Sequence, residues 1–320
     1  MASAKGQGQA LLRPALGSSV GTMDYPEDVT FYMEPDLRES AAAGKHNFIG
    51  KVASVLQNAG IRVTYRDFGA PHRGGYSLSH MKEPPDPQGL VFRRVYHYPF
   101  WQIERSAARW QWDVACANFD GEDIDRAEAD RFYTFWQKRL FGDLPQRTSR
   151  NGFIYIPLQG RITRHRSFQH CSPIRMVEAC LAADERPIVA ALHPKEQYSA
   201  DEHAALYELE AAHPRLTVRQ GGMDALLRTC DCVVTQNSSV AFNGYFFRKP
   251  ALLFARVDFH HIAVKADLAD LARSFALLDA KCPDYAGYLH WFWQKKCINA
   301  GRPDAEMRIA ARFRRFGWLE

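Results

Sequence analysis

The sequence predicts an α/β protein in which two Rossmann-like domains with parallel sheets face each other. Strand-like apolar runs alternate with segments of helical periodicity along nearly the whole chain. A polar stretch with Gly and Pro, residues 142–150, separates two such series. The length of 320 residues suits two domains. We therefore expect a disordered leader, a first domain, a second domain and a helical segment that packs back on the first domain, over residues 1–22, 23–145, 146–285 and 286–320.

The first series opens as a β-α-β unit. Residues 29–33 form a strand-like run, and a helix follows in which apolar side chains recur at i, i+3 and i+4 from Phe48 to Ala59. Gly60 ends this helix, and residues 61–65 are the second strand. A strand, a helix and a strand in this order imply a parallel pair. Many Gly and Pro residues over 69–89 predict a long loop.

An aromatic and basic segment follows. Between residues 96 and 112, Tyr and Trp side chains alternate with basic ones, and the Arg side chains of this region and its approach are Arg93, Arg94, Arg105 and Arg109. Two interpretations are open: a surface that faces an acceptor or a membrane, or a domain core with solvated charges between its rings. A helix from about residue 124 to 140 then leads to the linker.

The second series repeats the alternation of strands and helices. Ser172 and Pro173 start a helix as its cap and first residue. Ser199 with Glu202 forms a capping-box pattern that opens another. Strand-like runs are predicted at residues 153–157, 187–192, 216–218, 232–235 and 251–254.

Composition narrows the class of protein. The net charge is +5 with the basic residues scattered, which favours anionic ligands or an anionic membrane surface and gives no indication of nucleic acid binding. The seven Cys show neither a disulfide framework nor paired zinc-ligand spacing, so we expect reduced thiols in a cytoplasmic protein and no metal site. No stretch approaches the apolar length of a membrane span, and residues 1–22 lack the apolar region that is typical of a signal peptide.

Two strand ends predict a nucleotide-phosphate site. His193 and Pro194 end one strand, and Asn237, Ser238 and Ser239 end another. Ligands of parallel sheets bind at the carboxyl ends of the strands, where helix N-termini offer free N–H groups to phosphate. The simpler alternative is that His193 only ends a strand and Ser238 only caps a helix.

Three neighbouring side chains extend this prediction. Lys195 is a further candidate for phosphate, and Glu196 for the ribose or for orienting His193; both could equally be solvated charges at a helix start. Gln159, at another strand end, is a candidate for contact with the base or the acceptor.

A transfer reaction also needs a base. Glu34 and Asp36 follow the first strand, at the sheet edge that would face the second domain, and Asp120 is the third candidate. The alternative for Glu34 and Asp36 is a turn with helix-capping acids. The loop of Gly44, Lys45 and His46 could add donors at the start of the long helix.

Four elements of the second series carry a family resemblance: residues 157–159 (PLQ), His193-Pro194, residues 237–239 (NSS) and Lys249-Pro250. In order and rough spacing they are similar to those of capsule polysaccharide biosynthesis proteins, which include the CMP-Kdo transferases. The His-Pro and Ser-Ser elements also resemble those of bacterial GT-B sialyltransferases. The resemblance covers residues 150–262. The first-half acidic motif of those families has its nearest counterpart at residues 119–123, which departs from it.

The resemblance implies a GT-B glycosyltransferase of bacterial surface polysaccharide biosynthesis. The implied donor is a nucleotide-sugar, CMP-Kdo or another CMP-sugar, and the implied acceptor is a glycan or is linked to lipid. Helix ends and basic side chains would replace a metal, and no cofactor is expected. Two alternatives are a transferase that uses UDP- or GDP-sugars and a non-catalytic polysaccharide-assembly protein. The basic, aromatic tail at 307–318 either rests on the inner membrane surface or packs on the first domain.

Overall fold

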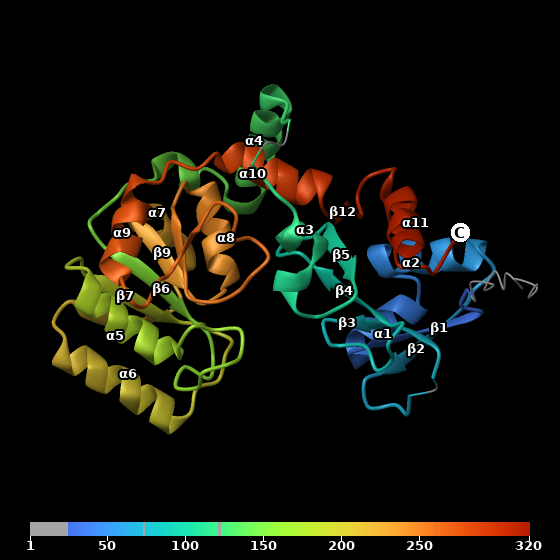
Figure 1. Cartoon of the computed structure of the whole chain (residues 1–320), viewed down its shortest axis with the longest axis horizontal. Coiled ribbons are helices and arrows are strands. Elements are labelled where there is room, and N and C mark those ends of the chain that lie inside the picture. Colours follow the sequence, from blue (N-terminus) through green and yellow to red (C-terminus); the bar gives the residue numbers. More distant parts are fainter. Residues whose placement is uncertain (1–24, 73, 121–122) are drawn as a thin grey trace, which may run out of the picture.

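Two six-stranded sheets organise the chain, as the computed structural model shows (Figure 1). The model describes residues 25–72, 74–120 and 123–320, so the predicted leader lies outside the described residues. The strand orders are β12-β5-β4-β3-β1-β2 and β11-β10-β9-β6-β7-β8. These parallel-dominated sheets confirm the predicted fold class of two Rossmann-like domains. Among the described residues, no helix has the length and apolarity to cross a membrane.

The first sheet combines a parallel centre with an antiparallel edge. β2, β1, β3 and β4 are parallel, β5 is antiparallel to β4, and β12 is in turn antiparallel to β5. The prediction that residues 69–89 form only a loop is wrong, because β3 lies between β1 and β4. Its Gly- and Pro-rich flanks outweigh the signal of a five-residue strand that has Leu78 as its one aliphatic residue. The strands are β1 (Asp28–Met33), β2 (Arg62–Asp67), β3 (Tyr76–His80), β4 (Leu90–Arg94), β5 (Phe100–Glu104) and β12 (Ile298–Asn299).

Helices cover this sheet, and the C-terminal helix is one of them. The long helix α2 buries Phe48, Val52 and Leu56, as its periodicity predicts. α11 packs on α2 through Ile309 and Phe313, so the tail lies on the first domain (Figure 1). The elements are α1 (Pro35–Ala42), α2 (Asn47–Asn58), the 3-10 helix η1 (Arg109–Gln111), α3 (Asp113–Cys116) and α11 (Ala305–Arg315).

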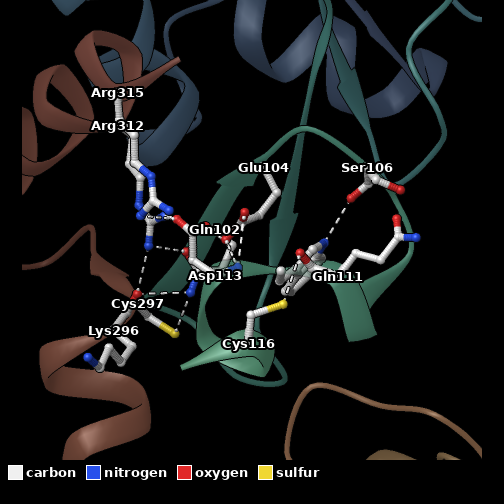
Figure 2. Close-up of polar contacts among 11 residues, drawn as sticks. Gln102, Glu104, Ser106, Gln111, Asp113, Cys116, Lys296, Cys297, Arg312 and Arg315 are labelled. Carbon is white, nitrogen blue, oxygen red and sulfur yellow. Dashed lines mark hydrogen bonds and ion pairs between the residues drawn. The ribbon is translucent and has the colours of Figure 1, made fainter. Parts of the chain in front are cut away.

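Polar contacts tie α11 to β5 and α3 (Figure 2). Arg312 pairs with Asp113 and also donates to the Gln102 side chain at 3.0 Å. The backbone N–H of Asp113 lies 3.3 Å from both carboxylate oxygens of Glu104, which is buried at the end of β5. This network fixes the tail against the segment that carries η1.

The second sheet is parallel throughout. Its predicted caps are confirmed: the Ser172 side chain accepts from the Arg175 N–H, and Ser199 and Glu202 form a complete capping box. The strands are β6 (Ile154–Leu158), β7 (Ile188–Leu192), β8 (Leu216–Gln220), β9 (Cys232–Thr235), β10 (Ala251–Leu253) and β11 (Val264–Lys265). The helices are α5 (Pro173–Ala183), α6 (Ala200–Ala212), α7 (Met223–Thr229), α8 (Ser239–Phe246) and α9 (Leu271–Ala280).

A continuous aromatic cluster joins the two domains. The Phe100 ring of β5 stacks on the Trp293 ring with their centroids 4.4 Å apart, and the centroids of Trp293 and Phe242 of α8 are 5.1 Å apart. All three side chains are fully buried, so burial of apolar surface stabilises the arrangement of the domains. The connecting elements are α4 (Arg126–Phe141), η2 (Leu144–Arg147), α10 (Tyr285–Leu289) and the π-helical turn η3 (His290–Lys295).

Candidate active site

A cavity of about 830 Å³ lies where the carboxyl ends of both parallel sheets meet. The first domain lines it with residues at the ends of β1, β3 and β4, and the second with residues that follow β6 and β9. This volume is that of an ordinary small-molecule site, and the carboxyl edge of parallel strands is where such sites form.

Glu34 and His80 form the wall on the side of the first domain. β1 pairs in parallel with β3 and brings Tyr32 beside Ser79. Glu34, which follows β1, and His80, the last residue of β3, therefore become neighbours. The Nδ1 atom of His80 lies 2.7 Å from Oε2 of Glu34. Burial favours a raised pKa for Glu34, but the hydrogen bond from His80, together with a backbone hydrogen bond and nearby positive charge, outweighs burial, and the pKa falls below its usual value. Burial lowers the pKa of His80, with Glu34 opposing this and Arg93 and Arg94 adding to it. The pair at neutral pH is therefore a carboxylate and a neutral imidazole.

Two further predicted residues line the same wall. Asp36 lies in the first turn of α1 and borders the cavity. His46 also borders it, but its Nδ1 accepts the Ile49 N–H at 3.2 Å, so it caps α2. The loop of Gly44, Lys45 and His46 thus gives the helix start an acceptor instead of leaving its N–H groups to a ligand.

Gln159, Asn237 and Ser239 form the opposite wall. They follow β6 and β9, which are neighbours in the second sheet. Ser239 is the first residue of α8, and its backbone is part of the positive end of the helix dipole. Ser238 is buried, and its hydroxyl accepts the Val240 N–H at 3.3 Å. Of the two serines, Ser239 lines the cavity and Ser238 caps the helix.

His193 and its neighbours lie one strand further along the sheet. The His193 Nδ1 accepts the Lys195 N–H at 3.2 Å, and the His193 carbonyl accepts the Glu196 N–H at 3.2 Å. Lys195 and Glu196 line an adjoining hollow of about 490 Å³ that shares Gln159 and Arg166 with the main cavity. Neither lining includes His193 or the exposed Pro194. The structure therefore does not bring His193 into one cavity with Ser239.

Asp120 lies apart from the other candidate bases. It borders a separate hollow with His260 and His261, and it does not border the cavity of Glu34. Sequence position alone could not separate these acids, because it does not show which cavity each of them borders.

Four arginines that the sequence did not single out as site residues line the cavity: Arg93, Arg94, Arg109 and Arg166. Arg109 donates to the Tyr96 hydroxyl at 2.6 Å and to the Asn237 carbonyl at 3.2 Å, and it lies 3.4 Å from the carboxylate of Asp258. Burial favours a lower pKa for Arg109, but Tyr96 and Asp258 raise it above its ordinary value. The basic and aromatic run near residue 100 was the available signal, because it supplies Arg93, Arg94 and Arg109 to the cavity.

An aromatic pair from both domains borders the cavity. The rings of Trp110 and Phe168 stack with centroids 5.5 Å apart. Arg256 lies over Trp110 at 4.7 Å and Arg166 over Phe168 at 4.9 Å, which gives two cation–π contacts. The stack links η1 to the loop after β6.

Comparisons with known proteins give fold-level likenesses of low similarity. No protein-family model and no curated protein matches the sequence. Among solved structures, Thermosulfurimonas dismutans KpsC, a beta Kdo 2,7 transferase, aligns with a TM-score of 0.48 and 10% identity over 89% of this chain and 99% of that one. The UDP-GlcNAc 2-epimerase of Neisseria meningitidis aligns with a TM-score of 0.36 and 12% identity, over 90% of this chain and 99% of that one. S. aureus MnaA, solved with UDP, aligns with a TM-score of 0.35 and 10% identity, over 92% of this chain and 98% of that one.

Proposed function

We propose that this protein is a glycosyltransferase of bacterial surface polysaccharide biosynthesis. It transfers a sugar from a nucleotide-sugar to a glycan or a lipid-linked acceptor. The observation that supports this most is the single cavity with carboxylates on the wall of the first domain and Asn237, Ser239 and a helix N-terminus on the wall of the second. A base and a phosphate site that face each other are what such a transfer needs.

In this proposal the donor binds to the second domain. Its phosphate meets the Ser239 hydroxyl, the N-terminus of α8 and the guanidinium of Arg166, and its nucleoside extends into the hollow of Lys195 and Glu196. The resemblance of the His-Pro and Ser-Ser elements to those of CMP-Kdo transferases and bacterial sialyltransferases favours CMP as the nucleotide, with CMP-Kdo or another CMP-sugar as donor. The helix end and the arginines supply positive charge without a metal ion.

Glu34 is the proposed base. Its carboxylate takes the proton of the acceptor hydroxyl as that oxygen bonds to the anomeric carbon, and the bond from this carbon to the donor phosphate breaks. The phosphate leaves with the bonding electron pair, and donors already in place stabilise its charge. Asp36 on the same wall is the second candidate. A lipid-linked acceptor would place the enzyme in the cytoplasm at the inner membrane surface.

A donor-hydrolysis assay against CMP-, UDP- and GDP-sugars tests the proposal. We expect release of the nucleotide from CMP-sugars and loss of that release in Glu34→Gln. Turnover of only UDP- or GDP-sugars would support the alternative donor class, since a diphosphate also suits a helix N-terminus. Nucleotide binding without turnover of any donor or acceptor would support a non-catalytic assembly protein.

A further inference from the structure

Arg93 and Arg94 are adjacent cations at the carboxyl end of β4, and both line the main cavity. Within residues 25–72, 74–120 and 123–320, neither guanidinium has a hydrogen-bond or ion-pair partner. Arg109, in contrast, is held by Tyr96, Asp258 and Asn237. The structure therefore presents two unmatched guanidinium groups to whatever fills the cavity.

The acids of the same cavity are mostly engaged elsewhere. Glu34 is held by His80 at 2.7 Å. Glu83 accepts from the Ser106 hydroxyl at 2.7 Å and the Ala107 N–H at 2.9 Å. Asp258 accepts from Tyr96 and lies near Arg109. Among the described residues of the lining, Asp36 is then the carboxylate that no other side chain contacts. It supplies one negative charge, whereas Arg93 and Arg94 supply two positive charges.

Arg93 interacts electrostatically with groups from both domains, among them His80 and Asp258. Burial lowers the pKa of Arg93, and Arg109 adds to this, while Tyr96 and Asp258 oppose it. Arg93 and Arg94 also act on His80, the partner of Glu34. A partly desolvated cation with a cationic neighbour is stabilised by a bound anion.

We propose that Arg93 and Arg94 form a subsite for a sugar carboxylate beside the reacting atoms. The inference rests on the proposed function and adds to it the residues that would recognise the carboxylate of an acidic sugar such as Kdo. The planar fork of a guanidinium matches a carboxylate with two parallel hydrogen bonds. The phosphate of the donor has its own donors on the second domain, so this subsite serves a second anionic group. That carboxylate belongs to the donor sugar or to the acceptor sugar.

Calorimetric titration of the whole chain tests the subsite without requiring turnover. The variants are Arg93→Gln and Arg94→Gln, with Arg131→Gln as the control that removes one exposed positive charge of α4. For the acceptor arm, methyl β-D-glucuronide and methyl β-D-glucoside are titrated at saturating CMP. For the donor arm, CMP-N-acetylneuraminate is compared with CMP. Circular dichroism reports folding, and Arg94, being exposed, gives the second test if Arg93→Gln does not fold.

We expect one acid probe to lose roughly ten- to a hundredfold in affinity in Arg93→Gln, since a hydrogen bond to a charged group contributes roughly that factor. The glucoside, CMP and Arg131→Gln should be unaffected. The arm that responds identifies the source of the carboxylate. Three results would overturn the subsite. The acid probes could bind no more tightly than the glucoside or CMP, they could fail to bind, or their affinity could be unchanged in Arg93→Gln and Arg94→Gln. Loss of CMP binding in Arg93→Gln would overturn it too, by assigning the pair to the nucleotide phosphate. Wild-type protein that does not bind CMP contradicts the proposed donor instead.

Discussion

The hydroxyl of Tyr96 donates a hydrogen bond to the carboxylate of Asp258 and so joins the two domains below the cavity. Tyr96 follows β4, and Asp258 follows β10 and is fully buried. Tyr96 has a φ of +66°, a left-handed conformation that is uncommon outside glycine. Its ring also stacks on Phe242 at 4.4 Å. The same residue therefore contributes to the aromatic cluster and to the polar floor of the site.

Replacement of Arg109 by Leu should destabilise the protein. The variant leaves the buried Asp258 with Tyr96 but without its cation, and breaking a buried ion pair in this way costs about 3–5 kcal/mol. Urea unfolding measures the change, with Arg131→Leu as control. The double variant Arg109→Leu, Asp258→Leu should recover part of the loss; equal stability of Arg109→Leu and wild type would show that the pair contributes nothing.

Glu34→Gln should remove most of the transfer activity. General base catalysis contributes roughly 10²–10⁴-fold, and Gln cannot take the proton. Asp36→Asn should reduce turnover less, and neither variant should change the affinity for CMP. Steady-state transfer rates and CMP titration check this. A larger loss in Asp36→Asn would make Asp36 the base, and intact turnover in both would contradict this wall as the site of the base.

His80→Ala should shift the acid limb of the pH–rate profile to higher pH. Burial alone would raise the pKa of Glu34, and the hydrogen bond from His80 is the largest of the contacts that together hold it low, so loss of this bond lets the pKa rise. A base with a higher pKa becomes protonated, and inactive, at a higher pH. His80→Asn, which can still donate an N–H, should shift the limb less. An acid limb that does not move in His80→Ala would show that the protonation of Glu34 does not set the pH dependence of the rate.

The sequence predicts that His193→Ala abolishes transfer while the fold stays intact. The reason is that the leaving phosphate loses one hydrogen-bond donor, which lowers the rate roughly 10²–10³-fold. The structure adds a specific tautomer: because Nδ1 accepts the Lys195 N–H, the neutral ring carries its proton on Nε2. Ser239→Ala should cost less, since the N–H groups at the start of α8 remain. Turnover and thermal unfolding of both variants decide the matter. Near-normal turnover of His193→Ala would show that His193 only stabilises the turn after β7.

Glu104→Gln should make the free energy of unfolding depend less on pH. Burial raises the pKa of Glu104 to about 7, against the opposing effect of Arg312. Because the folded state holds this proton more tightly than the unfolded state, the free energy of unfolding falls as pH rises from about 4.5 to about 7, by on the order of 3 kcal/mol. The amide of the variant does not titrate in this range, so the fall should be smaller. Urea unfolding at pH 5 and pH 8 measures the difference, and parallel curves for both proteins would contradict it.

Local sequence determined most of the secondary structure. The i, i+3, i+4 spacing of α2, the capping residues Ser172 and Ser199, and the apolar runs of β6, β7 and β9 specify their elements through short-range interactions. The strand-end rule likewise predicted Glu34, Gln159 and Ser239 as residues at the carboxyl edges of sheets, and these three line one cavity. Each of these inferences needs only a few consecutive residues.

Tertiary structure decided which strand ends meet. Strand order cannot be derived from local pattern. β12 returns from residues 298–299 to pair with β5, and His193 lies one strand beyond the cavity wall. The roles of Arg93, Arg94 and Arg109 also depend on a partner or cavity supplied by distant chain segments. Whether an arginine is solvated, paired or left to bind a ligand is set by the charges that folding brings around it, and those charges come from residues far apart in the sequence.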